Sequence, residues 1–183
     1  MTRVTVVILA GGKSTRMGRD KLALPVGGGT MLTSAAERYG ALFGRVVLSV
    51  GDGAERNVPG TETVRDLYPG CGPMAGLHAA LKKWGEDVFL TAADMPYSDP
   101  RAAISIAEMC GGADACVLTD SVGRPEPLFA FYRARVLPAA EALLSGGRHS
   151  MRALLDAVNV KYVTPGQLGG LWSEKLIINV NEP

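Results

Sequence analysis

The chain has 183 residues, of which 47% are hydrophobic and 20% are charged. That length and composition fit one globular domain spanning residues 1–183, and they exclude a disordered chain. Lysine and arginine number 19 against 18 aspartate and glutamate residues, so a net charge of +1 favours neither nucleic acid nor an anionic membrane as a partner. Only 6% of residues are aromatic, which argues against a stacking surface for single-stranded nucleic acid.

Membrane and export signals are missing from the sequence. The longest apolar run, Val4–Ala10, already contains Thr5 and falls far short of the ~20 residues that a membrane span needs. The N-terminus lacks the basic, apolar and small-residue regions of a signal peptide. The three cysteines, Cys71, Cys110 and Cys116, include no CxxC pair and predict free thiols. We therefore expect a cytoplasmic protein that makes no membrane contact.

Short apolar runs alternate with longer amphipathic segments in the first two thirds of the chain. The runs that predict strands are Arg3–Leu9, Arg45–Val50, Thr61–Arg65, Asp87–Ala92 and Ala113–Thr119. The segments that predict helices are Thr30–Phe43, Pro73–Trp84 and Arg101–Cys110. This alternation predicts a three-layer α/β/α, Rossmann-like open sheet whose strands are mostly parallel.

The rhythm changes after Thr119. A turn-rich segment leads directly into Pro127–Tyr132, which reads as a strand that returns without a crossover helix and is therefore antiparallel to its neighbours. The remaining predicted elements are helices at Leu137–Leu144 and Ser150–Ala157 and strands at Lys161–Val163 and Lys175–Val180.

The loop after the first strand, Leu9–Lys21, carries the strongest functional signal. It reads LAGGKSTRMGRDK and combines three glycines, four basic residues and two hydroxyls in a chain that is otherwise nearly balanced in charge. Glycines let main-chain N–H groups approach a ligand closely, and fixed cations bind phosphate oxygens. A solvated basic loop is the simpler interpretation. However, open α/β sheets bind ligands at the carboxyl ends of their strands, which favours a polyphosphate site here.

Two common phosphate motifs do not fit this loop. A Walker A motif ending in Gly12-Lys13-Ser14 needs a glycine where Val7 stands inside the strand. The dinucleotide fingerprint GxGxxG, counted from Gly11, needs a glycine where Lys13 stands. A P-loop kinase, which would transfer a γ-phosphate, is therefore not favoured.

The pattern LAGGxSxRMGxDK, unbroken from Leu9 to Lys21, resembles the signature of nucleotidyltransferases that activate small phosphorylated compounds with an NTP. Among these it is most similar to the molybdenum cofactor guanylyltransferases. The similarity continues along nearly the whole chain in the family's order, through Arg65-Asp66, Gly72–Gly76, Ala93–Pro96 and Ile178–Asn181. The resemblance also implies the sheet type of the nucleotide-diphospho-sugar transferases.

The resemblance implies transfer of GMP from GTP to the terminal phosphate of molybdopterin bearing molybdenum, with release of pyrophosphate. It assigns GTP contacts to Leu9, Ala10, Gly11, Gly12, Lys21, Ser49, Asp66 and Asp94, and catalytic roles to Arg16, Lys21 and Asp94. Ser49 stands where relatives carry an asparagine that contacts the nucleotide. Beyond GTP and the pterin acceptor, the implied partners are molybdoenzymes or cofactor-loading proteins.

Asp94 is the expected metal ligand. It follows a predicted strand, so its carboxylate belongs at the carboxyl edge, and Mg²⁺ prefers one or two carboxylates together with phosphate oxygens and water. The alternative, that Asp94 caps the next helix, is less favoured because Asp99 is better placed as the cap. Asp66 also ends a short strand, and a purely turn-forming role stays open for it.

The expected acceptor-binding residues are Asn179, Asn181 and Arg124. Two asparagines that lie two apart on the predicted strand Lys175–Val180 share one face, where their amides suit a phosphate or a pterin edge. A buried, satisfied asparagine pair and a surface arginine are the simpler interpretations.

Three other functions stay open. A cytidylyltransferase acting on the same pterin and a sugar-phosphate nucleotidyltransferase belong to the same enzyme class. Relatives that use CTP tend to read Ala-Ala-Gly where this chain reads Ala10-Gly11-Gly12, which favours guanine. A non-catalytic GTP-binding module that delivers the cofactor is the third alternative, but such a module does not need Asp94 opposite the phosphate loop.

Overall fold

A seven-stranded sheet organises the molecule. The computed structural model describes residues 4–11, 25–26, 29–51 and 56–180. In the sheet the strands lie in the order β5-β4-β1-β6-β8-β7-β9. Their bounds are β1 Val4–Leu9, β4 Val46–Ser49, β5 Glu62–Val64, β6 Asp87–Ala92, β7 Ala115–Thr119, β8 Pro125–Tyr132 and β9 Val160–Val163.

In this seven-stranded sheet all neighbouring pairs are parallel except those that involve β8. This strand runs antiparallel to both β6 and β7, with Phe89 opposite Phe131 and Cys116 opposite Phe131. The register of the β7–β8 pair shifts between Val117 and Leu118. Val117 lies opposite Ala130, but Leu118 lies opposite Glu126. The prediction of a mostly parallel sheet with one antiparallel strand is therefore confirmed.

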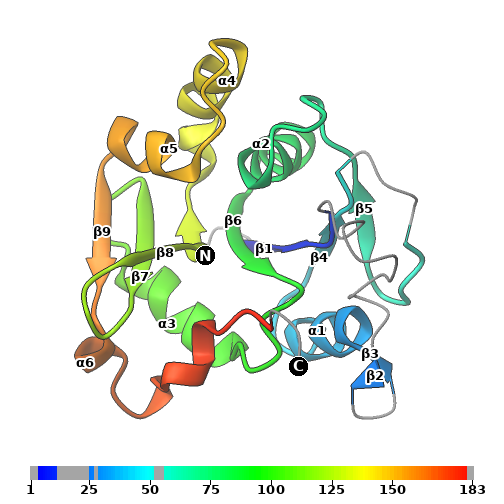
Figure 1. Cartoon of the computed structure of the whole chain (residues 1–183), viewed down its shortest axis with the longest axis vertical. Helices are drawn as coiled ribbons and strands as arrows, with labels where there is room; N and C mark the ends of the chain where they lie inside the picture. The colour runs from blue at the N-terminus through cyan, green and yellow to red at the C-terminus, as the bar shows by residue number, and fades with distance from the viewer. Residues whose placement is uncertain (1–3, 12–24, 27–28, 52–55, 181–183) are drawn as a thin grey trace.

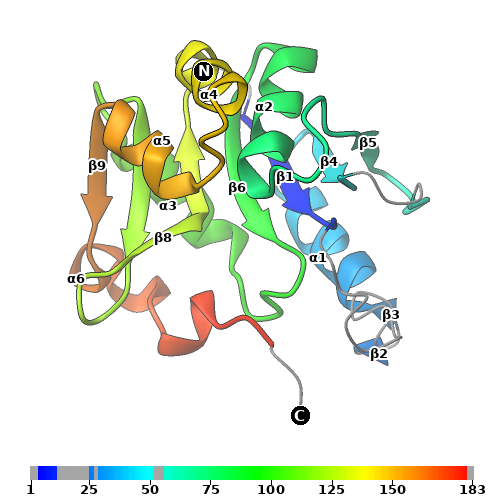
Figure 2. The ribbon, with the colours of Figure 1, turned by 45° about the horizontal axis from the view of Figure 1, so that its top comes forward.

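Helices cover both faces of the sheet, as Figures 1 and 2 show. Helices α1 (Met31–Gly40) and α3 (Pro100–Met109) lie on one face, and α2 (Pro73–Trp84), α4 (Leu137–Ser145) and α5 (Met151–Ala157) lie on the other. Among the described residues no helix combines the length and the apolar character needed to cross a membrane.

The two faces of β1 show why the sheet is buried on both sides. Val6 and Ile8 belong to the core on the face that α1 and α3 cover, whereas Val7 belongs to the core on the α2 face, and all three side chains are fully buried. Successive strand residues point to opposite faces, so a parallel strand between two helical layers must be apolar throughout. Each buried side chain of this size contributes roughly 1.5–3 kcal/mol relative to its exposed state.

The prediction of a last strand at Lys175–Val180 is wrong. The chain instead forms a 3₁₀ helix at Glu174–Ile177, which buries Leu176, and then continues extended. This segment crosses the carboxyl end of β6 instead of pairing along an edge strand, and the Val180 N–H donates to the Asp94 carbonyl at 3.0 Å. Figure 1 shows it in red. The apolar pattern of this segment is typical of a strand. The burial of Leu176 and the hydrogen bond from Val180 to Asp94 instead stabilise the 3₁₀ helix and the extended residues after it.

Several short elements were not predicted. Strands β2 (Pro25–Val26) and β3 (Gly29–Thr30) pair with each other, and a single helical turn, α6, spans Pro165–Leu168. Two 3₁₀ helices span Ala134–Val136 and Gly169–Leu171. All of these elements are too short for periodicity to identify.

Helix α2 lies close to the sheet at Gly76. A Cβ atom there would lie 2.3 Å from Ser49 Oγ and 3.0 Å from Leu9 Cδ2. The absence of a side chain at Gly76 therefore sets how closely α2 packs over the carboxyl ends of β1 and β4.

Gly76→Ala should lower the free energy of unfolding by about 1 kcal/mol, because overpacking costs ~1–3 kcal/mol while the better helix propensity of alanine returns ~1 kcal/mol. Ser49→Ala removes the closest contact, so the same substitution in that background should be neutral or stabilising. Urea unfolding of the four proteins measures this coupling, with Gly40→Ala as the control because nothing lies within 4 Å of a Cβ at Gly40. Equal effects of Gly76→Ala in both backgrounds would refute the packing argument.

Candidate nucleotide site

The carboxyl ends of three parallel strands meet at one edge of the sheet. The Leu9 carbonyl accepts a hydrogen bond from Ala93 N–H at 3.1 Å, and Ala10 N–H donates to the Ser49 carbonyl at 2.8 Å. These bonds extend the pairing of β1 with β6 and β4 by one residue. The segments that leave the three strands therefore start side by side.

Gly11 lies against the segment that leaves β4. A Cβ at Gly11 would stand 2.7 Å from the Val50 carbonyl carbon and 2.8 Å from Gly51 N. Those neighbours are backbone atoms that cannot rotate away, so only glycine fits here. Gly51 itself has φ +62°, the left-handed conformation that also favours glycine. The glycine requirement predicted for the start of the loop is thus explained by backbone packing at Gly11.

Three of the expected phosphate-loop residues lie outside the described residues. They are Gly12, Arg16 and Lys21. Their assignment to GTP contact and catalysis remains a prediction from the sequence.

Asp94 follows β6 by two residues and is partly exposed at this edge. The helix that comes after it, α3, is capped by Asp99, whose carboxylate accepts from Arg101 N–H at 2.8 Å. The prediction that Asp99 and not Asp94 serves as the cap is confirmed. The hydrogen bond from Val180 N–H to the Asp94 carbonyl fixes the C-terminal segment beside the Asp94 loop.

That segment places Asn179 near Asp94, although not on a strand. The Asn179 Oδ1 atom is buried and accepts no hydrogen bond from the described part of the chain. A buried amide oxygen without a hydrogen-bond donor destabilises the protein. A ligand that donates a hydrogen bond to this oxygen would remove that cost. Asn181 lies outside the described residues. The prediction that the two asparagines share a strand face is wrong, because the segment that contains Asn179 is not a strand.

Asp66 and Ser49 occupy different depths. Asp66 N–H donates to the Gly51 carbonyl at 3.3 Å, and its Oδ2 atom would be 3.7 Å from a Cβ at Gly51. Asp66 therefore lies beside the glycine-lined segments Gly11 and Gly51. Ser49 is 3% exposed, and its hydroxyl lies under Gly76 of α2. The structure thus brings the Ser49 backbone to the edge and directs its side chain into the helical layer.

Arg124 stands at the mouth of a cavity of about 390 Å³ that it shares with Asp120, Glu126 and Glu174. Its side chain is 80% exposed, and its guanidinium forms an ion pair with Asp120 at 2.7 Å. The Asp120 carboxylate also accepts the Arg124 and Val122 N–H groups, which closes the turn before β8. The side chain is available at the surface for an acceptor, but the same contacts serve the turn.

Glu126 was not predicted as a site residue. It lies at the start of β8, and because β8 is antiparallel, this start falls at the carboxyl edge where Asp94 lies. Burial, followed by the charges of Asp94 and Asp120, raises the pKa of the Glu126 carboxyl, while the hydrogen bond from Leu128 N–H opposes the rise. The sequence predicted that this strand is antiparallel, and an antiparallel strand starts at the edge where its parallel neighbours end. That prediction could have placed Glu126 beside Asp94.

Glu126→Gln should increase the free energy of unfolding at pH 7. Because the folded-state pKa is raised, the native protein binds more protons than the unfolded chain above the ordinary glutamate pKa, and its stability falls as pH rises through that window. Glutamine keeps the Oε1 acceptor and removes the charge, so the gain over wild type should shrink as pH falls toward ~4. Urea unfolding between pH 4 and 8 in EDTA measures it, with exposed Glu37→Gln as the control. A constant difference across this range would argue against the assignment.

The donor set at this edge suits a hard divalent cation. The described residues contain no cluster of three or more side chains typical of a metal site held by protein alone. Mg²⁺ does not need such a cluster, because it binds through one or two carboxylates and takes its other oxygens from phosphates and water. Asp94 supplies a carboxylate at this edge, and its charge contributes to the raised pKa of Glu126. These residues fit the magnesium ion that the resemblance implies.

The open, mostly parallel seven-stranded sheet has the fold of the nucleotidyltransferases. The sequence matches the MobA-like NTP transferase domain over residues 6–161, and the chain belongs to that family. It is similar to two proteins each described as a probable molybdenum cofactor guanylyltransferase. The one from Carboxydothermus hydrogenoformans is 33% identical, with 100% of this chain and 93% of the relative covered. The one from Pelotomaculum thermopropionicum is 34% identical, with 100% and 90% covered.

Solved structures agree with this placement. Molybdopterin-guanine dinucleotide biosynthesis protein A from Archaeoglobus fulgidus superposes with a TM-score of 0.81 at 26% identity, covering 98% of this chain and 93% of that one. The 2-C-methyl-D-erythritol 4-phosphate cytidylyltransferase from Thermus thermophilus superposes with a TM-score of 0.69 at 15% identity, covering 100% and 94%. The second likeness shows a shared fold alone.

Proposed function

We propose that this protein transfers GMP from GTP to the terminal phosphate of molybdenum-bearing molybdopterin and releases pyrophosphate. The observation that carries the proposal is the juxtaposition of two segments at the carboxyl edge. The glycine-lined start of the phosphate loop and the Asp94 loop are joined by the Leu9–Ala93 hydrogen bond. The descriptions of the relatives from C. hydrogenoformans, P. thermopropionicum and A. fulgidus support the choice of guanine and of a pterin acceptor.

In this reaction an oxygen of the acceptor phosphate attacks the α-phosphorus of GTP in line. The new P–O bond forms as the bond to the β-phosphate bridging oxygen breaks, and that electron pair leaves with pyrophosphate. No carbon chemistry is involved, so the protein contributes by positioning groups and neutralising charge. A magnesium ion, held by Asp94, would neutralise phosphate oxygens when bound.

Different residues of the chain are proposed to contact the nucleotide, its phosphates and the acceptor. The backbone at Leu9–Gly11 lines the nucleotide, and Lys21 and Arg16 supply positive charge to the phosphates and to the departing pyrophosphate. We assign acceptor binding to Asn179, whose buried Oδ1 lacks a hydrogen-bond donor in the described part of the chain, and to the exposed side chain of Arg124. Both assignments extend the predictions from the sequence.

Pyrophosphate release with each of the four NTPs, measured with and without molybdenum-bearing molybdopterin, tests the proposal. GTP should support release only when the acceptor is present, and mass spectrometry should identify a guanine dinucleotide product. A preference for CTP would show that the protein is a cytidylyltransferase and not a guanylyltransferase. Tight GTP binding without turnover in the presence of acceptor would instead identify a non-catalytic binding module.

A further inference from the structure

The loop that carries Asp94 is bonded to helix α1 through Arg38. This loop, which we call the Asp94 loop, spans residues 93–99 and joins β6 to α3. The Met95 carbonyl accepts a hydrogen bond from Ser98 N–H at 3.2 Å and another from Arg38 Nη2 at 3.4 Å. The same Nη2 atom donates to Ser98 Oγ at 3.5 Å. One guanidinium group of α1 thus contacts the residue that follows Asp94 and the turn behind it.

Packing and hydrogen bonds fix the loop on both sides of Asp94. Ala93 and Met95 are buried in the core that α1 covers, whereas Asp94 between them is partly exposed. The Val180 N–H donates to the Asp94 carbonyl at 3.0 Å, and Arg38 donates to the carbonyl one residue later. Two successive carbonyls of the Asp94 loop therefore have partners from distant parts of the chain.

An arginine at position 38 is energetically costly. Its side chain is half-buried, and its Nε atom is buried without a hydrogen-bond partner among the described residues. Burial lowers the pKa of the Arg38 guanidinium, while the charges of Tyr39 and Asp99 oppose the fall. The Asp99 carboxylate is paired with Arg101 at 2.7 Å, and Arg38 forms no ion pair with the described part of the chain. A half-buried cation without an ion pair stabilises a fold less than an apolar side chain of similar size does. Stability alone does not explain this arginine.

We propose that Arg38 is a positioning residue for Asp94: its bond to the Met95 carbonyl orients the Asp94 carboxylate toward the metal ion that accompanies the nucleotide. This inference rests on the proposed function, because it assumes a metal ion at Asp94. Groups that lie behind a metal ligand fix its orientation, and removing one typically costs roughly 10- to 100-fold in metal affinity or activity. We expect the lower end of that range, since Arg38 acts through the main chain of the next residue.

Arg38→Met tests this role through the effect of a metal on GTP affinity. Calorimetry of GTP binding in EDTA, and with enough Mn²⁺ to convert GTP to its metal complex, gives the factor by which the metal tightens binding. That factor should fall roughly tenfold in Arg38→Met, whereas the affinity in EDTA should not change. In an Asp94→Asn background Arg38→Met should cause no further loss, because both changes remove the same interaction. Arg38→Lys, which keeps a charged donor, should recover part of the factor.

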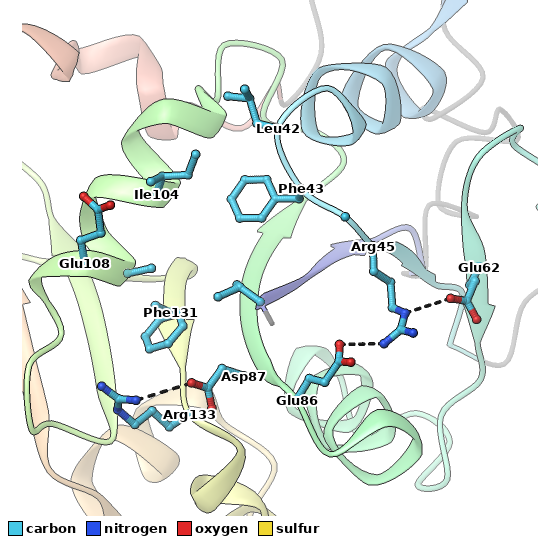
Figure 3. Close-up of a pocket in the computed structure, with 13 residues that line it drawn as sticks. Leu42, Phe43, Arg45, Glu62, Glu86, Asp87, Ile104, Glu108, Phe131 and Arg133 are labelled. Atoms are coloured by element: carbon cyan, nitrogen blue, oxygen red, sulfur yellow. Dashed lines mark hydrogen bonds and ion pairs between the residues drawn. The ribbon is translucent and has the colours of Figure 1, made fainter. Parts of the chain in front are cut away.

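Arg133→Met is the matched control. Figure 3 shows Arg133 beside Asp87 at the other edge of the sheet, where the parallel strands begin. Like Arg38 it is half-buried and donates to main-chain carbonyls, those of Gly111 and Ala113, at 2.6 and 3.0 Å. Unlike Arg38 it pairs with a carboxylate, that of Asp87, at 3.5 Å. Arg133→Met should lower the urea midpoint of unfolding and leave the metal factor unchanged, since it deprives a buried carboxylate of its cation. Arg38→Met should leave the midpoint unchanged or raise it.

None of these measurements depends on turnover. A wild-type metal factor in Arg38→Met, or a loss that adds fully to that of Asp94→Asn, would overturn the inference. A urea midpoint that falls as far as that of Arg133→Met, together with weaker GTP binding in EDTA, would show a purely structural role and would also overturn it. If the wild type shows the metal factor and the Arg38 effect but transfers no GMP, the proposed function fails and the inference stands. A wild type whose GTP affinity does not respond to Mn²⁺ would overturn both.

Discussion

Asp94→Asn is expected to lower the rate of pyrophosphate release by a factor on the order of 10³, since a metal-held phosphate contributes several kcal/mol of charge stabilisation. Asparagine keeps the shape of the side chain and its position beside β6 but is a weaker ligand for Mg²⁺. The magnesium concentration that gives half-maximal activity should therefore also rise, by at least about tenfold. Steady-state assays over a range of magnesium concentrations measure both effects.

Asp156→Asn is the matched control for this experiment. Asp156 pairs with Arg152 on the exposed face of α5, away from the carboxyl edge. It should leave activity and magnesium dependence unchanged. An Asp94→Asn enzyme with wild-type turnover and an unaltered magnesium requirement would remove Asp94 from the mechanism.

Lys21→Ala is expected to reduce kcat/KM for GTP by roughly 10²- to 10³-fold, the loss typical of removing one charged donor from a transition state. Part of the loss should appear in GTP affinity, because Lys21 is proposed to contact the phosphates before and during transfer. Equilibrium binding of GTP and initial rates of pyrophosphate release separate the two contributions. Lys21→Arg should retain more activity than Lys21→Ala, since it keeps the charge.

Lys83→Ala provides the comparison for the lysine experiment. Lys83 is exposed near the end of α2, where it donates to the Thr63 carbonyl and lies over the Trp84 ring. It should not change GTP affinity. Unaltered GTP binding and turnover in Lys21→Ala would show that the phosphate loop does not depend on this cation.

The sheet was predictable because a buried parallel strand has few alternatives. Apolar β-branched runs such as Arg3–Leu9 and Asp87–Ala92 suit strands covered on both faces, and β1 and β6 occupy nearly those bounds. The antiparallel β8 was predictable because no helix-length segment separates it from the preceding strand. The signal in each case came from local pattern and connection length.

The C-terminal segment was not predictable on the same basis. Leu176 is buried, and the residues after it cross the end of β6, where Val180 donates a hydrogen bond to Asp94. No local periodicity in the sequence predicts either contact. The role of Glu126 was hidden for a similar reason, since its closeness to Asp94 depends on the pairing of β8 with β6. Long-range geometry of this kind decides the shape of the proposed acceptor side.

Within the site, the sequence predicted which segments converge but not how each side chain points. Leu9, Ala10 and Asp94 meet at the carboxyl edge as expected from parallel strands. Ser49 shares the edge only through its backbone, because its hydroxyl is buried under Gly76. The contact at Gly76 depends on how α2 packs over the sheet, which the sequence pattern does not specify.

A crystal structure with GTP and Mn²⁺, with anomalous data collected at the manganese edge, is the most direct test of the nucleotide site. The triphosphate should lie along Gly11–Lys21, and the anomalous peak should fall between its phosphate oxygens and the Asp94 carboxylate. Nucleotide bound in another cleft, or manganese held away from Asp94 while the triphosphate contacts none of these residues, would contradict the proposed function.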